Sequence, residues 1–288
     1  MSNSQHQLKI RLAPWALLSV SMAWGWAFVI MKDAIQRQSV NNFLFTRFGL
    51  AVIVMILIRP KVIKLIDQDL LLRAGAAGVL LGSGYIFQTL GLARTGAAIT
   101  GFVTGLYIVL TPLFASLILG QRVSRFTWSC IALGTAGLGL LSIRGWSVGL
   151  GELLTFISAI LFALHIIALS KWSPGRDAYA MTVVQLAMCA ILAGIASIPG
   201  GYAPPPDTDV WGVVIFTAVF ATAIAFIIQT WSQAHMSPIK VAVILTMEVV
   251  FAAIFAILFG GEILSLQSSI GGVLVICAMY LIVIREEK

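Results

Sequence analysis

The chain has 288 residues, of which 60% are hydrophobic and only 10% are charged. Soluble domains carry about 25% charged residues, so this sequence cannot cover a water-facing surface and most of its solvent must be lipid. Its length leaves room for roughly ten spans of ~20 residues and for no sizeable soluble domain. The net charge of +7 does not indicate nucleic-acid binding, because Lys and Arg follow a membrane topology.

Ten apolar segments follow one another, and each is expected to form a transmembrane helix. Most are bounded by charged residues, Gly or Pro, and the longest polar break runs from Pro199 to Asp209. The basic N-terminus and the first apolar run resemble a signal peptide. That run is too long and lacks a convincing cleavage site, so we interpret it as a retained first span. The segments are 13–32, 41–58, 72–92, 97–119, 126–143, 150–170, 178–198, 210–231, 239–259 and 267–284.

Lys and Arg are distributed unequally between the two ends of these segments. With a cytoplasmic N-terminus, thirteen of the 18 fall on the inner side and four on the outer side, while Arg47 lies inside a span. Cytoplasmic loops carry the excess of Lys and Arg in membrane proteins. Both termini are therefore expected in the cytoplasm. The four on the outer side are Lys32, Arg37, Arg94 and Arg144.

One stretch of the chain occurs twice. Residues 88–144 recur at 229–285 with an offset of 141 and no gap, and the identical pairs include Gln88/Gln229 and Gly120/Gly261. Duplication of a five-span unit explains this pattern and predicts two units, 1–146 and 147–288. Because five is odd, the second unit must enter the membrane from the opposite side. The expected fold is therefore all-α, with ten helices in two inverted repeats around a central cavity, as in many secondary transporters.

Five short motifs stand out along the chain: Trp24-Gly25, Arg47, the hairpin Leu92 to Ala98, its counterpart Ala234 to Pro238, and Glu248 followed by Gly261-Glu262. Together they resemble the EamA-type members of the drug/metabolite transporter superfamily. Two departures are Val249, where the family has Pro after the ninth-span Glu, and Gln121, where the first copy lacks the Gly-Glu carboxylate. Within this superfamily, the presence of Tyr85 and the aromatic content make the chain similar to the YddG-like amino-acid exporters. The resemblance implies export across a bacterial inner membrane.

Glu248 and Arg47 are the ionisable residues deepest in the predicted spans. A charge there costs about 2.5 kcal/mol or more. For Glu248, two interpretations stay open: it binds a substrate ammonium or carries a coupling proton, or it is a protonated group bonded to a neighbouring helix. For Arg47, a structural role at helix-end carbonyls is favoured over pairing with a substrate carboxylate.

Aromatic and polar side chains recur at mid-span, where placing them in lipid would be costly. In the fold that the resemblance implies, the third and fourth spans of both halves wall the cavity. With the offset of 141, Tyr107 falls opposite Glu248, which predicts polar residues at equivalent depths on opposite walls. Such a cavity suits an amphipathic ligand or a cation. The candidate substrate-binding residues are Trp24, Tyr85, Gln88, Tyr107, His165, Gln229 and Glu248, with Phe28, Phe162 and Gln185 as further candidates.

The sequence lacks the motifs of the main alternative classes. It contains no Gly-x-x-x-x-Gly-Lys-Ser/Thr loop, and hence no ATPase motor. It also lacks HExxH, a metal cluster and a nucleophile elbow, so we expect no enzyme and no cofactor. The expected partners are a small-molecule substrate and the lipid bilayer, without nucleic acid or an ATPase subunit, and a monomer is compatible with the sequence.

Export of amino acids and similar amphipathic metabolites, with aromatic amino acids as candidates, is the favoured function. Multidrug cation efflux on the same fold is an alternative. Transport of nucleotide sugars or sugar phosphates is another, although it requires several Lys or Arg in the spans to bind phosphates. A membrane-embedded enzyme is less favoured.

Overall fold

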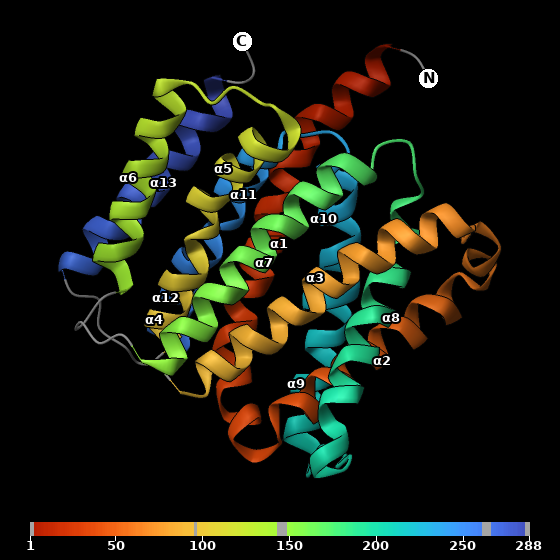
Figure 1. The fold of residues 1–288 in the computed structure, drawn as a ribbon. Coiled ribbons are helices and arrows are strands. Elements are labelled where there is room, and N and C mark those ends of the chain that lie inside the picture. The colour runs from red at the N-terminus through yellow and green to blue at the C-terminus, as the bar shows by residue number, and fades with distance from the viewer. Residues whose placement is uncertain (1–2, 95–96, 143–148, 261–265, 286–288) are drawn as a thin grey trace.

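The computed structural model describes residues 3–94, 97–142, 149–260 and 266–285, and every regular element within these ranges is helical (Figure 1). The expected all-α class is therefore confirmed for the described residues. The predicted turn at Thr95-Gly96, Arg144 and the Gly261-Glu262 pair lie outside them. The uninterrupted long helices are α1 (Asn3–Arg37), α2 (Val40–Ile58), α3 (Gln68–Leu92), α6 (Arg125–Ser142), α7 (Leu150–Trp172), α8 (Ala178–Ser197) and α13 (Leu266–Arg285).

Three of the predicted segments are interrupted rather than continuous helices. The fourth consists of α4 (Ala97–Gly105) and α5 (Tyr107–Leu119), and the ninth of α11 (Pro238–Leu245) and α12 (Met247–Gly260). In the eighth, a π-helical turn, η3, replaces the α-helical hydrogen bonding between α9 and α10. The bounds of these pieces are α9 (Thr208–Ala218), η3 (Val219–Ile224) and α10 (Ala225–Gln233), and the short 3₁₀ turns are η1 (Pro60–Leu65) and η2 (Ile198–Gly200).

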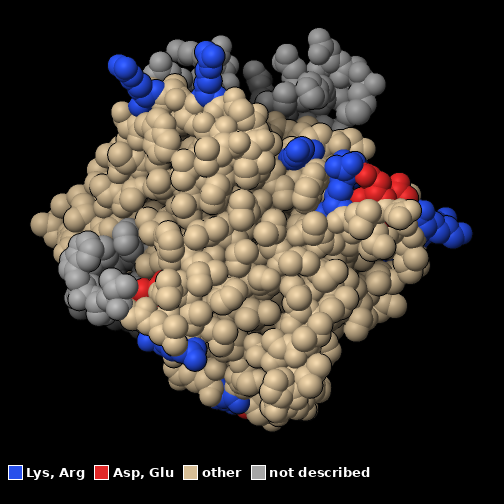
Figure 2. Space-filling model, in the orientation of Figure 1, with Lys and Arg blue, Asp and Glu red and all other residues tan. Residues whose placement is uncertain are grey.

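Several helices are long and apolar enough to cross a membrane. Within the described ranges, seven stretches meet that condition by length and composition, and two shorter apolar helices, Val103–Leu119 and Ser269–Ile282, accompany them. Figure 2 shows a broad belt without charged side chains between charged groups at the upper and lower ends. The chain is therefore a multi-pass membrane protein. The seven stretches are Leu12–Arg37, Val40–Ile58, Gln68–Leu92, Leu150–Trp172, Ala178–Gly200, Thr208–Gln233 and Pro238–Phe259.

The first half of the chain packs mainly against the second half. The most extensive contacts are those of α3 with α7 and α8, α6 with α13, α2 with α8, and α1 with α12 (Figure 1). The packing is also repeated: α3 packs on α7 as α10 packs on α1, and α5 packs on α7 as α12 packs on α1. Elements related by the sequence repeat thus have equivalent neighbours.

Close contacts between these helices depend on particular glycines. A Cβ at Gly78 on α3 would lie 2.7 Å from the Gln185 carbonyl oxygen on α8, and a Cβ at Gly25 on α1 would lie 2.7 Å from the Ala252 nitrogen on α12. Because lipid provides no hydrophobic driving force between helices, such small surfaces let backbones approach and pack.

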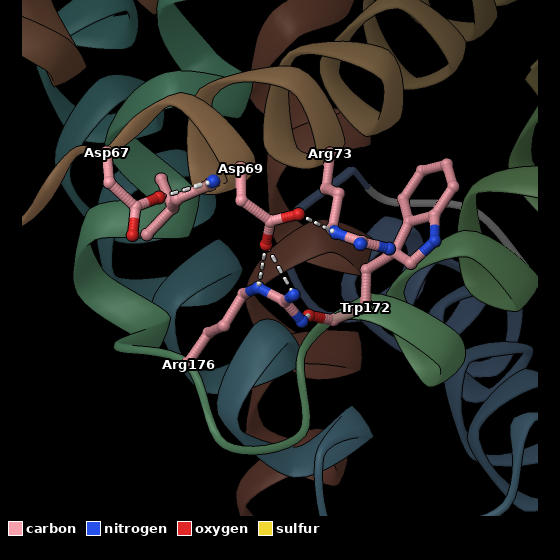
Figure 3. A network of polar contacts seen from close by, with 6 residues as sticks. Asp67, Asp69, Arg73, Trp172 and Arg176 are labelled. Atoms are coloured by element: carbon pink, nitrogen blue, oxygen red, sulfur yellow. Dashed lines mark hydrogen bonds and ion pairs between the residues drawn. The ribbon is translucent and has the colours of Figure 1, made fainter.

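Polar contacts fasten the connections at one end of the bundle. Asp69 near the start of α3 accepts hydrogen bonds from Arg73 at 2.6 Å and from Arg176, after α7, at 2.6 Å (Figure 3). Asp67 caps α3 by accepting the Leu70 N–H at 2.7 Å, and Arg176 also donates to the Trp172 carbonyl. These ion pairs are partly exposed, so each contributes little to stability, and they mainly fix where α3 begins relative to α7.

Candidate substrate cavity

A cavity lies between the two halves, with about 620 Å³ of empty space that includes its open side. All seven residues predicted to bind substrate line it, together with nine others. Its walls come from α1, α2, α3, α5, α7, α10, α11 and α12. The lining residues are Trp24, Ala27, Phe28, Met31, Arg47, Leu81, Tyr85, Gln88, Tyr107, Phe162, His165, Ile166, Phe226, Gln229, Leu245 and Glu248.

Equivalent positions of the two halves supply most of this lining. The offset of 141 relates Tyr85 to Phe226, Gln88 to Gln229 and Tyr107 to Glu248, and all six line the cavity. At an offset of 138, three further pairs of lining residues correspond: Trp24/Phe162, Ala27/His165 and Phe28/Ile166. The two walls are therefore two copies of one arrangement, and apart from the Gln88/Gln229 pair their side chains differ.

Two helix breaks place Tyr107 and Glu248 at the cavity. Between α4 and α5, the N–H of Leu106 bonds to Val103, three residues back, at 3.2 Å; between α11 and α12, Val249 bonds likewise to Thr246 at 3.2 Å. The Thr246 hydroxyl also donates to the Val243 carbonyl at 2.6 Å, a contact that bends helices. The ninth segment therefore breaks without the Pro of the family pattern.

Polar groups without a hydrogen-bond partner lie at these two breaks and on α10. Glu248 is 5% exposed and makes no hydrogen bond or ion pair with any described residue. The Tyr107 hydroxyl and the Gln229 Oε1 are buried polar atoms without a partner in the described part of the chain. Such a group costs roughly 1–3 kcal/mol when left unsatisfied, so this part of the cavity is suited to a polar ligand.

Arg47 is anchored to the π-helical turn. Its Nε donates to the Thr222 hydroxyl at 2.7 Å and its Nη2 to the Ala221 carbonyl at 3.1 Å. A π turn shifts the i→i−4 ladder and frees carbonyls for such contacts. The guanidinium carbon also lies 5.5 Å from the centroid of the Tyr85 ring, within cation–π range. These contacts support the structural role favoured for Arg47, although the residue also lines the cavity.

The aromatic side of the cavity is organised around Phe226. Its ring centroid lies 5.3 Å from that of Trp24, 6.1 Å from that of Tyr85 and 6.5 Å from that of His165. Trp24 is held in place because its Nε1 donates to the Ala221 carbonyl at 2.8 Å, which Arg47 also uses. Sequence reasoning missed Phe226, although the offset of 141 from Tyr85 could have found it.

Comparisons with known proteins agree with this architecture. A model of the EamA-like transporter family matches the chain twice, at residues 11–143 and 149–284. The chain belongs to this family. The predicted resemblance is therefore confirmed, and the chain is a membrane transporter of a family whose named relatives are transporters and exporters rather than enzymes.

Relatives in this family cover nearly the whole chain. An uncharacterized transporter of Archaeoglobus fulgidus is 29% identical over 270 residues, 93% of this chain and 85% of the relative. The pseudopaline exporter CntI of Pseudomonas aeruginosa is 22% identical over 255 residues, 86% of this chain and 88% of the relative. A solved crystal structure has a TM-score of 0.76 at 18% identity, covering 96% of this chain and 98% of that chain, which supports the fold.

Proposed function

We propose that the chain is a secondary transporter that exports amino acids and similar small amphipathic metabolites, with aromatic amino acids as favoured substrates. The observation that carries this proposal is the cavity lining, which combines aromatic rings with one guanidinium, Arg47, and one carboxyl group, Glu248. These two groups form no ion pair with each other. A zwitterion with an apolar side chain complements such a lining, since it presents a carboxylate, an ammonium and a hydrophobic part.

Transport would proceed by alternating access between two inverted five-helix units, 1–146 and 147–288, with ten spans and cytoplasmic termini in a bacterial inner membrane. The boundary between the units lies outside the described residues. The repeated packing and the doubled cavity lining support two equivalent units. The start of α1 and the end of α13 lie at the same end of the molecule (Figure 1). An even number of spans requires this arrangement.

The cavity lining also bears on the rival substrates. Arg47 is the one Lys or Arg among the lining residues, and all three of its side-chain nitrogens already donate within the protein. A phosphate-bearing substrate would lack the cluster of cations that binds phosphates. Lipophilic cations would meet Glu248 and several ring faces, so multidrug efflux is tested beside amino-acid export.

Proteoliposomes containing the purified protein provide the test. Uptake is measured for aromatic and aliphatic amino acids, nucleotide sugars and lipophilic cations, with and without a proton gradient. We expect uptake of amino acids that Tyr107→Ala reduces. Tyr280→Ala is the matched control, because Tyr280 lies on α13, is 61% exposed and does not line the cavity. Transport of nucleotide sugars alone, or of lipophilic cations alone, contradicts the proposal.

Reporter fusions test the proposed topology separately. A fusion at Lys288 should report a cytoplasmic location, and a fusion within Pro204 to Asp207 an external one. A C-terminus outside the cytoplasm contradicts the proposed number of spans or their orientation.

A further inference from the structure

His165 is a cavity-lining residue to which the proposed transport cycle assigns no role. Its side chain is 1% exposed and lines the cavity from α7. Its Nε2 lies 2.8 Å from the Oε1 of Gln185 on α8. Its Nδ1 has no hydrogen-bond partner among the described residues. Which of the two nitrogens carries the hydrogen decides what the ring can recognise.

The surroundings of Gln185 fix the orientation of its amide group. Its Nε2 donates to the Met181 carbonyl at 3.2 Å and to the Thr230 hydroxyl at 3.4 Å. A backbone carbonyl only accepts hydrogen bonds. If the amide were turned around, its oxygen would face the Met181 carbonyl oxygen at 3.2 Å, and neither atom can donate. The Thr230 hydroxyl could donate as well as accept, so it is the Met181 carbonyl that decides the orientation. The Gln185 Oε1 therefore faces His165, and an amide oxygen also only accepts.

It follows that the hydrogen of a neutral His165 is on Nε2. A neutral imidazole carries one N–H, so Nδ1 keeps a lone pair and accepts. Nδ1 is not among the enclosed polar atoms that lack a partner. Nδ1 has no hydrogen-bond partner among the described residues, and its ring lines the cavity, so this lone pair is the one available to a ligand there.

We infer that His165 is a fixed hydrogen-bond acceptor in the substrate cavity, and that Gln185 is the positioning residue that sets its tautomer. The group recognised is an N–H or O–H donor, and the ammonium of an amino acid meets this requirement. This substrate class rests on the proposed function. Glu248 and the unpartnered Gln229 Oε1 add two further acceptors to the same lining, so a donor with several hydrogens suits it best.

The tautomer can be measured without any substrate. The chain has three histidines, His6, His165 and His235, so ¹⁵N-histidine labelling of the full-length protein with His6→Gln and His235→Gln leaves the His165 signals alone. We expect the hydrogen on Nε2 and none on Nδ1. Gln185→Glu keeps an acceptor and should preserve this pattern, whereas Gln185→Met should let both tautomers appear. A hydrogen on Nδ1 in the parent, or an unchanged pattern in Gln185→Met, overturns the inference.

Recognition of a donor is tested with two probes that differ in one group, phenylalanine and 3-phenylpropionate, which lacks the ammonium. Binding is measured by calorimetry on the solubilised protein. The parent should prefer phenylalanine, and His165→Phe should reduce that preference about tenfold, which is what loss of one hydrogen bond to a charged group implies. His165→Asn should retain part of it, because its amide oxygen can occupy the place of Nδ1.

The outcomes separate the inference from the proposed function. If phenylalanine binds the parent and His165→Phe weakens both probes equally, the inference is overturned and the proposed function stands. If neither phenylalanine nor any other amino acid binds the parent, the proposed function is overturned together with the substrate class, while the labelling experiment still decides the tautomer.

Discussion

Substitution of Gly25 by Ala should separate α1 from α12 beside the cavity. The added Cβ would lie 2.7 Å from the Ala252 nitrogen, 2.7 Å from the Phe251 Cβ and 2.8 Å from the Glu248 carbonyl oxygen. These distances fall 0.6–0.7 Å short of 3.4 Å, where ordinary contacts begin. Two of the three atoms belong to the backbone, so no side chain can rotate away and the helices must move. Overpacking of this kind costs about 1–3 kcal/mol.

Gly49→Ala is the matched control, since a Cβ at Gly49 on α2 meets nothing within 4 Å. Ala is favoured over Gly in a helix by up to ~1 kcal/mol, so this variant should be as stable as the parent or slightly more stable. Thermal unfolding of the purified proteins at one fixed scan rate gives the comparison. For soluble domains of similar size, a loss of 1 kcal/mol in the free energy of unfolding lowers the unfolding temperature by about 2–4 °C. If Gly25→Ala unfolds at or above the temperature of the parent, the close contact does not constrain the two helices.

Tyr85→Ala and Tyr107→Ala should weaken transport while the protein still folds and inserts, measured as proteoliposome uptake beside the amount of folded protein; normal uptake by both would place the site elsewhere. Glu248→Gln should reduce uptake of substrates that carry an ammonium, whereas loss of pH dependence alone would identify a proton site. Arg47→Lys should lower thermal stability by about 1–3 kcal/mol, because a lysine cannot reproduce both charge-assisted hydrogen bonds of the guanidinium. The pKa of Asp207 lies below its usual range, chiefly because the Val210 N–H donates to it and also because Arg37 is near. Its stabilisation is therefore fully present above about pH 4 and is lost as pH falls through the lower folded-state value, so the difference in unfolding temperature between the parent and Asp207→Asn should begin to shrink below about pH 4.

Hydropathy predicted the helical segments well, because the backbone N–H and C=O groups of an apolar run in lipid must form hydrogen bonds within that run, as a helix does. It did not predict where helices are interrupted. The π turn at Val219–Ile224 and the break at Thr246 lie within continuous apolar runs, and hydropathy does not distinguish i→i+3, i→i+4 and i→i+5 hydrogen bonding. The missing Pro after Glu248 left the kink of the ninth segment undetermined, whereas the Thr246 hydroxyl contact marks it in the structure.

The polar part of the cavity was easier to predict than the apolar part. Gln88, Gln229 and Glu248 stand out because lipid-facing placement would be costly, so an internal cavity is the better place for them. Leu81 and Leu245 also line the cavity. An apolar side chain is equally stable facing lipid, so the sequence does not distinguish a cavity-lining Leu from one that packs between helices or faces lipid. The tautomer of His165 depends on an amide orientation in another helix, which no local sequence pattern encodes.

The pairing of Tyr107 with Glu248 has a consequence for how this cavity could arise. One copy of the sequence repeat provides about half of the lining, and two identical copies would place the same residue on both walls. Two carboxylates facing one space would repel each other, and two phenols would offer no charge. Joining both copies in one chain lets each wall change independently, with a phenol on one and a carboxyl group on the other. A bound molecule then meets two unlike sides, so one of its two orientations is preferred.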